Sequence, residues 1–132
     1  MTAADLARAS YQRCAAAPEF LSAFYQHFFQ ACPEAEPRFA HTDFERQHRL
    51  LTHAIGLLLS FPTQPPTEPT ILTRLAERHS RRDMAVPPSF YAPFIDSLIA
   101  TVAQYDPECT PEVEQAWRTT VAAGVEYMKA RF

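Results

Sequence analysis

The stretch Ile71–Arg82, ILTRLAERHSRR, decides how the rest of the chain is interpreted. Leu72, Leu75 and His79 are spaced three and then four residues apart, which places them on one face of an amphipathic helix. That face is apolar and is expected to point inward. A histidine there has two interpretations: a core residue hydrogen-bonded to a carbonyl, or a neutral imidazole that binds a metal or cofactor. The rest of the sequence has to decide between them.

The composition is that of an ordinary folded domain. The chain has 132 residues, of which 47% are hydrophobic and 20% are charged, so residues 1–132 are expected to form one domain with its own core. The formal net charge is -3 and the charges are interspersed, which argues against a nucleic-acid partner. The one basic cluster, Arg78, Arg81 and Arg82, fits either a solvated helix end or a site for a small anion.

Cysteine usage and hydropathy indicate where the protein works. Cys14, Cys32 and Cys109 are odd in number and isolated, which fits a reducing compartment and predicts neither a disulfide framework nor a zinc site. The N-terminal residues do not resemble a signal peptide. The longest apolar run, Ala54–Phe61, is too short to cross a membrane. We therefore expect a cytoplasmic protein without a membrane partner.

The glycine and proline content of the chain predicts an all-α fold. Two glycines and twelve prolines argue against tight β-hairpins, and no segment shows the alternation of a strand. We expect about six to eight helices, with Pro18 in the first turn of the second and a capping box of Thr42 and Glu45 at the next long one. The expected segments are helices over 3–17, 18–31, 42–60 and 71–82, a short piece at 33–38, a proline-rich loop at 62–69, and helices from about Ser89 and from Pro111.

Several residues are expected to face the core of these helices. The first helix presents Leu6, Ser10 and Tyr11. The last presents a stripe with mostly four-residue spacing, formed by Val113, Trp117, Val121, Gly124 and Met128.

Two ordered sets of motifs resemble a known family. The run FLSAFYQHFFQACPEAEPRFAHTDFERQ, residues 20–47, is similar to the distal half of bacterial globins: an aromatic helix with a Phe-Tyr pair, a Pro-Glu turn, a lone Phe and a helix that begins near a Gln. The spacing of LAERH, then VPPxxY, then a Trp-bearing helix resembles their proximal half. The chain therefore resembles single-domain bacterial globins and the globin part of flavohaemoglobins, which implies a globin fold around a haem pocket.

The resemblance implies a haem b cofactor and gives roles to four residues. His79 matches the proximal histidine, whose imidazole binds the haem iron, and Phe39 matches the phenylalanine that packs on the porphyrin. Tyr25 and Gln47 match a distal pair that donates hydrogen bonds to bound O2 and slows its release. As purely structural residues, Tyr25 would be a buried phenol with a backbone partner and Gln47 a surface residue near a helix start.

Five further positions match residues around the cofactor. Leu51 would limit the space over the iron, Leu75 and Val86 would line the proximal side, and Tyr91 would close the pocket behind the proximal histidine. All four are equally consistent with ordinary core residues. Arg78 is placed to reach a haem propionate, because a guanidinium group matches a carboxylate.

The other histidines are expected outside the pocket. His48 follows Gln47 and lies about 100° further round the helix. The remaining ones are expected at the surface or partly covered, without a role: His27, His41 and His53.

The sequence also departs from the family pattern. The segment between His79 and Tyr91 is two residues longer than usual, so the loop after the proximal helix should differ. Flavohaemoglobins have a glutamate late in the last helix that polarises the proximal histidine, and Phe132 stands at that spacing here. A strongly electron-donating histidine is therefore not expected. The sequence contains no flavin and NAD reductase domain, so redox turnover would need an external reductase.

These observations leave three classes of function. The first is a haem globin that binds O2, NO or CO, with Tyr25 and Gln47 as the residues of a nitric oxide dioxygenase reaction supported by an external reductase. The second is an oxygen store or a gas sensor that acts through a partner protein. The third is a haem-free interaction protein with a globin-like fold, which would leave the joint presence of His79, Phe39, Tyr25 and Gln47 without a purpose.

Overall fold

The structure is a computed structural model that describes all 132 residues, and the expected all-α architecture is confirmed. It has six α-helices, three short 3-10 helices and no strand. In chain order the elements are α1 (Ala3–Ala15), α2 (Phe20–Ala31), η1 (Pro33–Phe39), α3 (Phe44–Ser60), η2 (Phe61–Thr63), α4 (Thr73–His79), η3 (Pro88–Phe90), α5 (Tyr91–Tyr105) and α6 (Pro111–Ala130).

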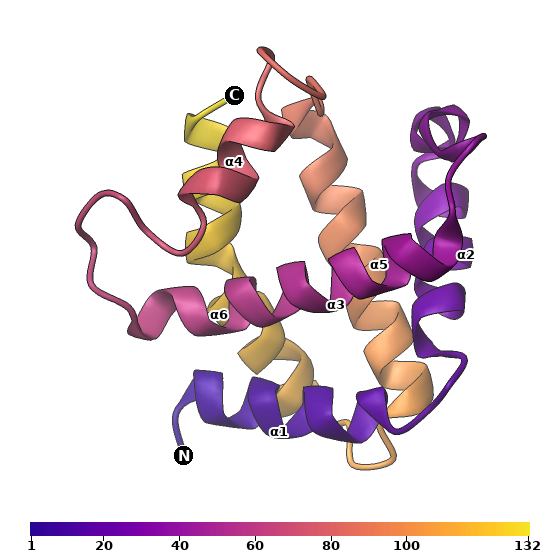
Figure 1. The fold of residues 1–132 in the computed structure, drawn as a ribbon. Coiled ribbons are helices and arrows are strands. Elements are labelled where there is room, and N and C mark those ends of the chain that lie inside the picture. The colour runs from indigo at the N-terminus through magenta and orange to yellow at the C-terminus, as the bar shows by residue number, and fades with distance from the viewer.

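The helices cross one another in layers, as Figure 1 shows. Helices α1 and α3 run across the view, whereas α2, α5 and α6 run steeply. The two most extensive packings pair α2 with α5 and α1 with α6. Helix α4 lies beside the C-terminal end of α6. No helix is both long enough and apolar enough to cross a membrane.

The apolar stripe of α6 is buried along its whole length, as predicted. Trp117 is fully enclosed, and the edge of the Tyr11 ring meets it at 5.9 Å between ring centroids. Gly124 allows α6 to come close to its neighbours, because a Cβ there would lie 2.7 Å from Leu58 Cδ2 and 2.9 Å from Leu72 Cδ1. The second of these leucines directly precedes α4, so the packing of α6 helps to place the helix that carries His79.

The inward face of α1 differs from the prediction. Ser10 is fully buried as expected, but Leu6 and Tyr11 are only half-buried. The buried face also includes Ala7 and Cys14, whose small side chains let α1 approach α6 closely. The helix ends at Ala15, two residues earlier than predicted.

Buried charge joins α1 to the C-terminal end of α5. Asp106 is buried and accepts hydrogen bonds from Ser10 Oγ at 2.6 Å and from Arg13 Nε and Nη2 at 2.6 and 2.9 Å. Burial would raise the pKa of Asp106, but these hydrogen bonds outweigh it and hold the pKa below its ordinary value. The carboxylate is therefore ionised at neutral pH and fully engaged.

One predicted helix start and one predicted cap are wrong. Helix α2 begins at Phe20, and Pro18 lies in the preceding turn rather than in the first turn of the helix. The cap of α3 is Asp43, whose side chain accepts from the backbone N–H groups of Glu45 and Arg46 at 3.1 and 3.4 Å. The capping box of Thr42 and Glu45 is absent, because the helix begins at Phe44 and Asp43 is the residue beside its free amides.

Helix α4 is shorter than predicted at both ends. At its start, the Thr73 hydroxyl accepts from the Thr70 N–H at 2.7 Å, in a turn that precedes the helix. At its end, Ser80 is extended, and its hydroxyl donates to the Glu77 carbonyl at 2.7 Å. Because the serine side chain takes the place of a backbone donor, the helix stops directly after His79.

The proline-rich connection before α4 is fastened to α6 by one carboxylate. Glu68 accepts hydrogen bonds from Thr73 Oγ1 at 2.9 Å and from Tyr127 Oη at 2.9 Å, and it pairs with Arg131. The guanidinium group of Arg131 also lies 3.6 Å from the centroid of the Tyr127 ring. These contacts place the start of α4 against the last turns of α6.

Candidate functional site

His79 is the last residue of α4 and is half-buried. Its ring Nδ1 lies 2.9 Å from the Leu75 carbonyl oxygen, one helical turn earlier. A carbonyl can only accept, so Nδ1 carries the proton and Nε2 keeps a free lone pair. Burial is the main cause that lowers the pKa of His79, so the ring is neutral at neutral pH. A neutral imidazole with one nitrogen anchored and the other free is the form that binds a metal.

The loop after α4 closes back on the helix end. The Val86 N–H donates to the His79 carbonyl at 3.0 Å, and the Ala85 N–H donates to the Ser80 carbonyl at 2.8 Å. Ala85 reaches this position with a left-handed φ of 49°, which few residues with a Cβ adopt. The Arg81 N–H donates to the Phe132 carbonyl at 2.9 Å, so the C-terminal segment contacts the same loop.

Tyr25 and Gln47 are in contact. The Gln47 amide nitrogen donates to the Tyr25 hydroxyl at 3.0 Å and joins α3 to α2. Burial raises the pKa of Tyr25 to about 12, so its phenol stays protonated at neutral pH. The structure therefore brings the predicted distal pair together, with one hydroxyl proton left to donate.

An aromatic cluster surrounds the Tyr25 ring. Phe39, which the sequence placed at the cofactor, lies 5.5 Å from it between ring centroids. Four aromatic neighbours were not assigned to the site: Phe24 at 5.2 Å, Phe29 at 5.7 Å, Phe44 at 5.4 Å and His48 at 6.0 Å, the last with its ring nearly parallel to the tyrosine. The spacing held a signal for the last three, because Phe29 lies four residues after Tyr25 and His48 four after Phe44, which puts each pair on one helix face.

The predicted wall residues belong to the core or to its border. Leu51 is buried, and Leu75 and Tyr91 are half-buried against the same core cluster. Val86 is half-buried in the loop after α4. Burial raises the pKa of Tyr91 to about 12, so that this phenol is also neutral. Their roles toward a cofactor remain predictions.

Comparison with known proteins identifies the family. The family model for globins matches residues 22–128 of the chain.

The chain belongs to the globin family.

A solved structure agrees with this. This globin superposes with a TM-score of 0.92 on the crystal structure of a protein from Pseudomonas aeruginosa PAO1 that is described as structurally highly homologous to a human haemoglobin. The two chains are 32% identical, and the match covers 99% of this chain and 98% of that chain. No curated protein matches this globin.

The residues of this globin fit the haem that its family implies. Nowhere does the chain gather three or more His, Cys, Asp or Glu side chains that could hold a bare metal ion. His79 by itself offers one nitrogen, so a metal bound there needs its other ligands from a macrocycle, as haem provides. The lone neutral imidazole would therefore suit a haem iron as its protein ligand.

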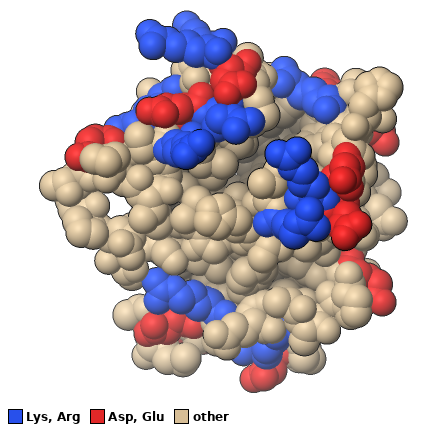
Figure 2. Space-filling model, in the orientation of Figure 1, with Lys and Arg blue, Asp and Glu red and all other residues tan.

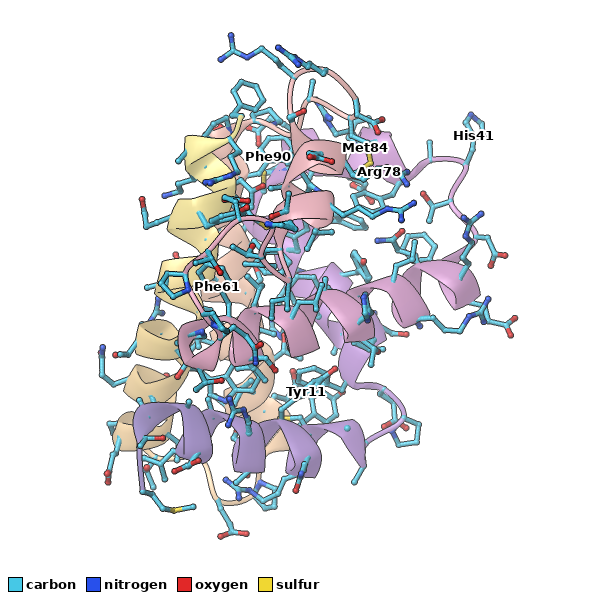
Figure 3. The ribbon with its side chains drawn as sticks, turned by 60° about the vertical axis from the view of Figure 1, so that its left-hand side comes forward. Tyr11, His41, Phe61, Arg78, Met84 and Phe90 are labelled. Carbon is cyan, nitrogen blue, oxygen red and sulfur yellow. The ribbon has the colours of Figure 1, made fainter.

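The basic residues near His79 are engaged with the protein. Arg78 is exposed, and its Nε pairs with Asp83 at 3.1 Å, so a haem propionate would compete with that carboxylate. Figure 3 shows Arg78 beside Met84 at the end of α4. Arg81 Nε donates to the Phe132 carbonyl at 3.2 Å. In Figure 2 acidic and basic side chains alternate around this face of the molecule, whereas its recessed centre carries no charge.

The other histidines lie away from His79. His41 projects away from the body of the molecule, and His53 is exposed on α3. His27 is half-buried and lies 3.1 Å from Gln104 Oε1. The His48 ring packs on Tyr25, and its place outside the haem pocket stays a prediction.

Proposed function

We propose that this globin binds haem b and uses it to hold O2 reversibly, with NO and CO as further ligands. When bound, the haem supplies an iron site for diatomic gases and a one-electron ferrous–ferric couple. Noncovalent haem b is supported by the isolated cysteines, since none belongs to the Cys-x-x-Cys-His motif that attaches haem covalently. The three cysteines are free, which agrees with a reducing cytoplasm.

The observation that carries the proposal is the pairing of a free imidazole nitrogen with an intact distal donor pair. His79 would hold the cofactor through Nε2, because Nδ1 is occupied by Leu75. Tyr25 would donate its hydroxyl proton to a bound gas, because its own acceptor site is occupied by Gln47. Phe39, Leu51, Leu75, Val86 and Tyr91 would line the pocket, and Arg78 would exchange Asp83 for a propionate.

The same donors favour a second function, the conversion of NO and O2 to nitrate. That reaction needs O2 to be held long enough for NO to arrive, and hydrogen bonds from Tyr25 and Gln47 serve this purpose. It consumes one electron per turnover, so an external reductase would complete the cycle. A protein that stores or senses O2 would show the same donors and no nitrate turnover.

Absorption spectra test the cofactor assignment. Purified protein given haemin should show a Soret band, and its pyridine haemochrome should be that of haem b. His79→Ala should lose most of the bound haem, and added imidazole should restore the spectrum because it replaces the missing ligand. His53→Ala, an exposed histidine of α3, should behave as the wild type. A wild-type protein that stays colourless with haemin would refute the proposal.

Nitrate formation tests the second function. The oxygenated protein mixed with NO should yield nitrate, and added reductase should sustain turnover. Stable O2 binding without catalytic turnover would leave a store or a sensor.

A further inference from the structure

Tyr25 borders a surface hollow of about 470 Å³ between α2, η1 and the start of α3. Phe29 and Phe44 stand on either side of the tyrosine, with ring centroids 5.7 and 5.4 Å from it. Both phenylalanines are half-buried, so part of each ring remains open to a ligand. The His48 ring completes the wall beside Phe44 at 6.1 Å. The hollow is therefore lined largely by aromatic rings.

The charged group that lines this hollow is acidic. Glu36 is exposed on η1 and lines the hollow, whereas no Lys or Arg does. Two arginines of η1 and α3 are engaged elsewhere: Arg38 donates to the carbonyls of Met84 and Ala85, and Arg49 pairs with Glu45. The remaining lining groups are neutral hydrogen-bonding side chains: Ser22, Gln26 and Gln30.

We propose that this hollow binds a small organic cation of the amine or quaternary ammonium class. Aromatic rings attract a cation through the negative charge of their faces, and Glu36 supplies the opposite charge. An anion would be repelled by that carboxylate. A hard metal ion would find a single carboxylate, where calcium takes six to eight oxygen ligands.

Tyr25 belongs both to the hollow and to the proposed gas site. A cation bound in the hollow would therefore affect the release of O2. Tyr25 lines the hollow, and its hydroxyl accepts the hydrogen bond from Gln47. A cation held at this ring draws electron density from it and makes the hydroxyl a stronger donor. O2 would then leave more slowly. This second step rests on the proposed gas function, whereas the binding of the cation does not.

The binding is tested with choline and with 3,3-dimethylbutan-1-ol, its uncharged isostere. Each is titrated into the purified protein at pH 8, and amide NMR shifts are followed. Choline should bind roughly tenfold more tightly than the alcohol. Its shifts should be confined to α2, η1 and the start of α3. Glu36→Gln should weaken choline binding about fivefold, and Phe44→Leu should weaken it as well. Glu45→Gln, an exposed carboxylate of α3 outside the hollow, should leave it unchanged.

The proposal is overturned if the two compounds bind equally, if the shifts lie elsewhere, or if Glu36→Gln binds choline as well as the wild type. Stopped-flow release of O2 in saturating choline tests the coupling, and we expect release to slow roughly twofold. An unchanged rate would overturn the coupling. If the protein bound neither haem nor O2, the choline titration would still give its answer, so the two proposals can fail separately.

Discussion

The hydrogen bond between Gln47 and Tyr25 determines what the tyrosine can offer to a ligand. A hydroxyl has one proton and two acceptor positions, and the Gln47 amide occupies an acceptor position. The proton is left to be donated, and burial keeps the phenol from ionising. Gln47 in turn keeps its second amide hydrogen. The hydrogen bond between the two side chains thus fixes two donors, the Tyr25 hydroxyl and the Gln47 amide, next to each other.

Removal of the Tyr25 hydroxyl should make O2 leave faster. A hydrogen bond to a partly charged acceptor contributes about 1.5–3 kcal/mol, so Tyr25→Phe should raise the O2 dissociation rate roughly tenfold to a hundredfold. Gln47→Leu should raise it too, and the double variant should show less than the product of the two effects because the residues act as a pair. The rates are measured by stopped-flow with an O2 scavenger.

Tyr105→Phe is the matched control for this series. Tyr105 ends α5 and packs against Phe20 at 6.1 Å, away from the Gln47 contact. Its loss of a hydroxyl should leave the O2 dissociation rate at the wild-type value. Equal rates for Tyr25→Phe and the wild type would contradict the distal assignment.

At the scale of elements, α4 is too short to hold its own position. Seven residues form fewer than two turns, and an isolated helix of this length is unstable in water. Its position comes from neighbours: Glu68 fixes its start to α6, and the loop that follows it is tied to η1 by Arg38. Arg38 donates to the carbonyls of Met84 and Ala85 at 3.0 and 3.3 Å, and it lies over the Phe90 ring at 5.5 Å.

Loss of the Arg38 contacts should loosen the loop after His79. Arg38→Met keeps the length of the side chain and removes both hydrogen bonds, so haem should leave the protein several-fold faster while the O2 dissociation rate changes less. Transfer of haem to an excess of apomyoglobin measures the rate. Arg49→Met, which removes a cation from a fully surface ion pair, should lose haem at the wild-type rate. If Arg38→Met lost haem as slowly as the wild type, the position of the loop would not depend on the Arg38 contact.

At the scale of the whole molecule, Asp106 joins two helices that are distant in sequence. Its carboxylate is stabilised in the ionised form, so the stability that it contributes is present above the ordinary aspartate pKa of about 3.9 and is lost as the pH falls through its lower native value. Asp106→Asn should reduce the free energy of unfolding by about 2 kcal/mol at pH 7, because the part-buried, charged hydrogen bonds with Arg13 are weakened. The difference from the wild type should shrink below about pH 4.

Urea unfolding at pH 7 and pH 3 measures this difference. Asp96→Asn provides the control, since Asp96 forms a surface ion pair with Arg118 at 3.0 Å. It should change the stability little at either pH. A loss of stability with Asp106→Asn that is as large at pH 3 as at pH 7 would show that the charge is not responsible.

The sequence predicted the helices and the stripe of α6 better than it predicted where helices end and which distant residues meet. Helical periodicity reveals a buried stripe, so the stripe of α6 could be predicted from Val113 to Met128. The end of α4 depends on the Ser80 hydroxyl, which could equally have faced solvent. The contact between Ser10 and Asp106 spans 96 positions and has no local signal.

For the candidate site too, the sequence marked some residues and not their neighbours. Resemblance to the family marked His79, Tyr25 and Gln47, because their order along the chain is informative. It did not mark Phe29, which lies one turn after Tyr25 on α2, or His48, which reaches Tyr25 through the packing of α3 on α2. Residues that only contact a site residue are not part of the family's sequence motif and cannot be recognised from it.

Burial of Tyr25 also affects its hydroxyl proton. A phenolic proton that is shielded from water exchanges slowly with solvent. It should therefore give a resolved proton NMR resonance at a frequency of its own. That resonance would move when a gas accepts the hydrogen bond, so the protein contains an internal spectroscopic probe of ligand binding that needs no label.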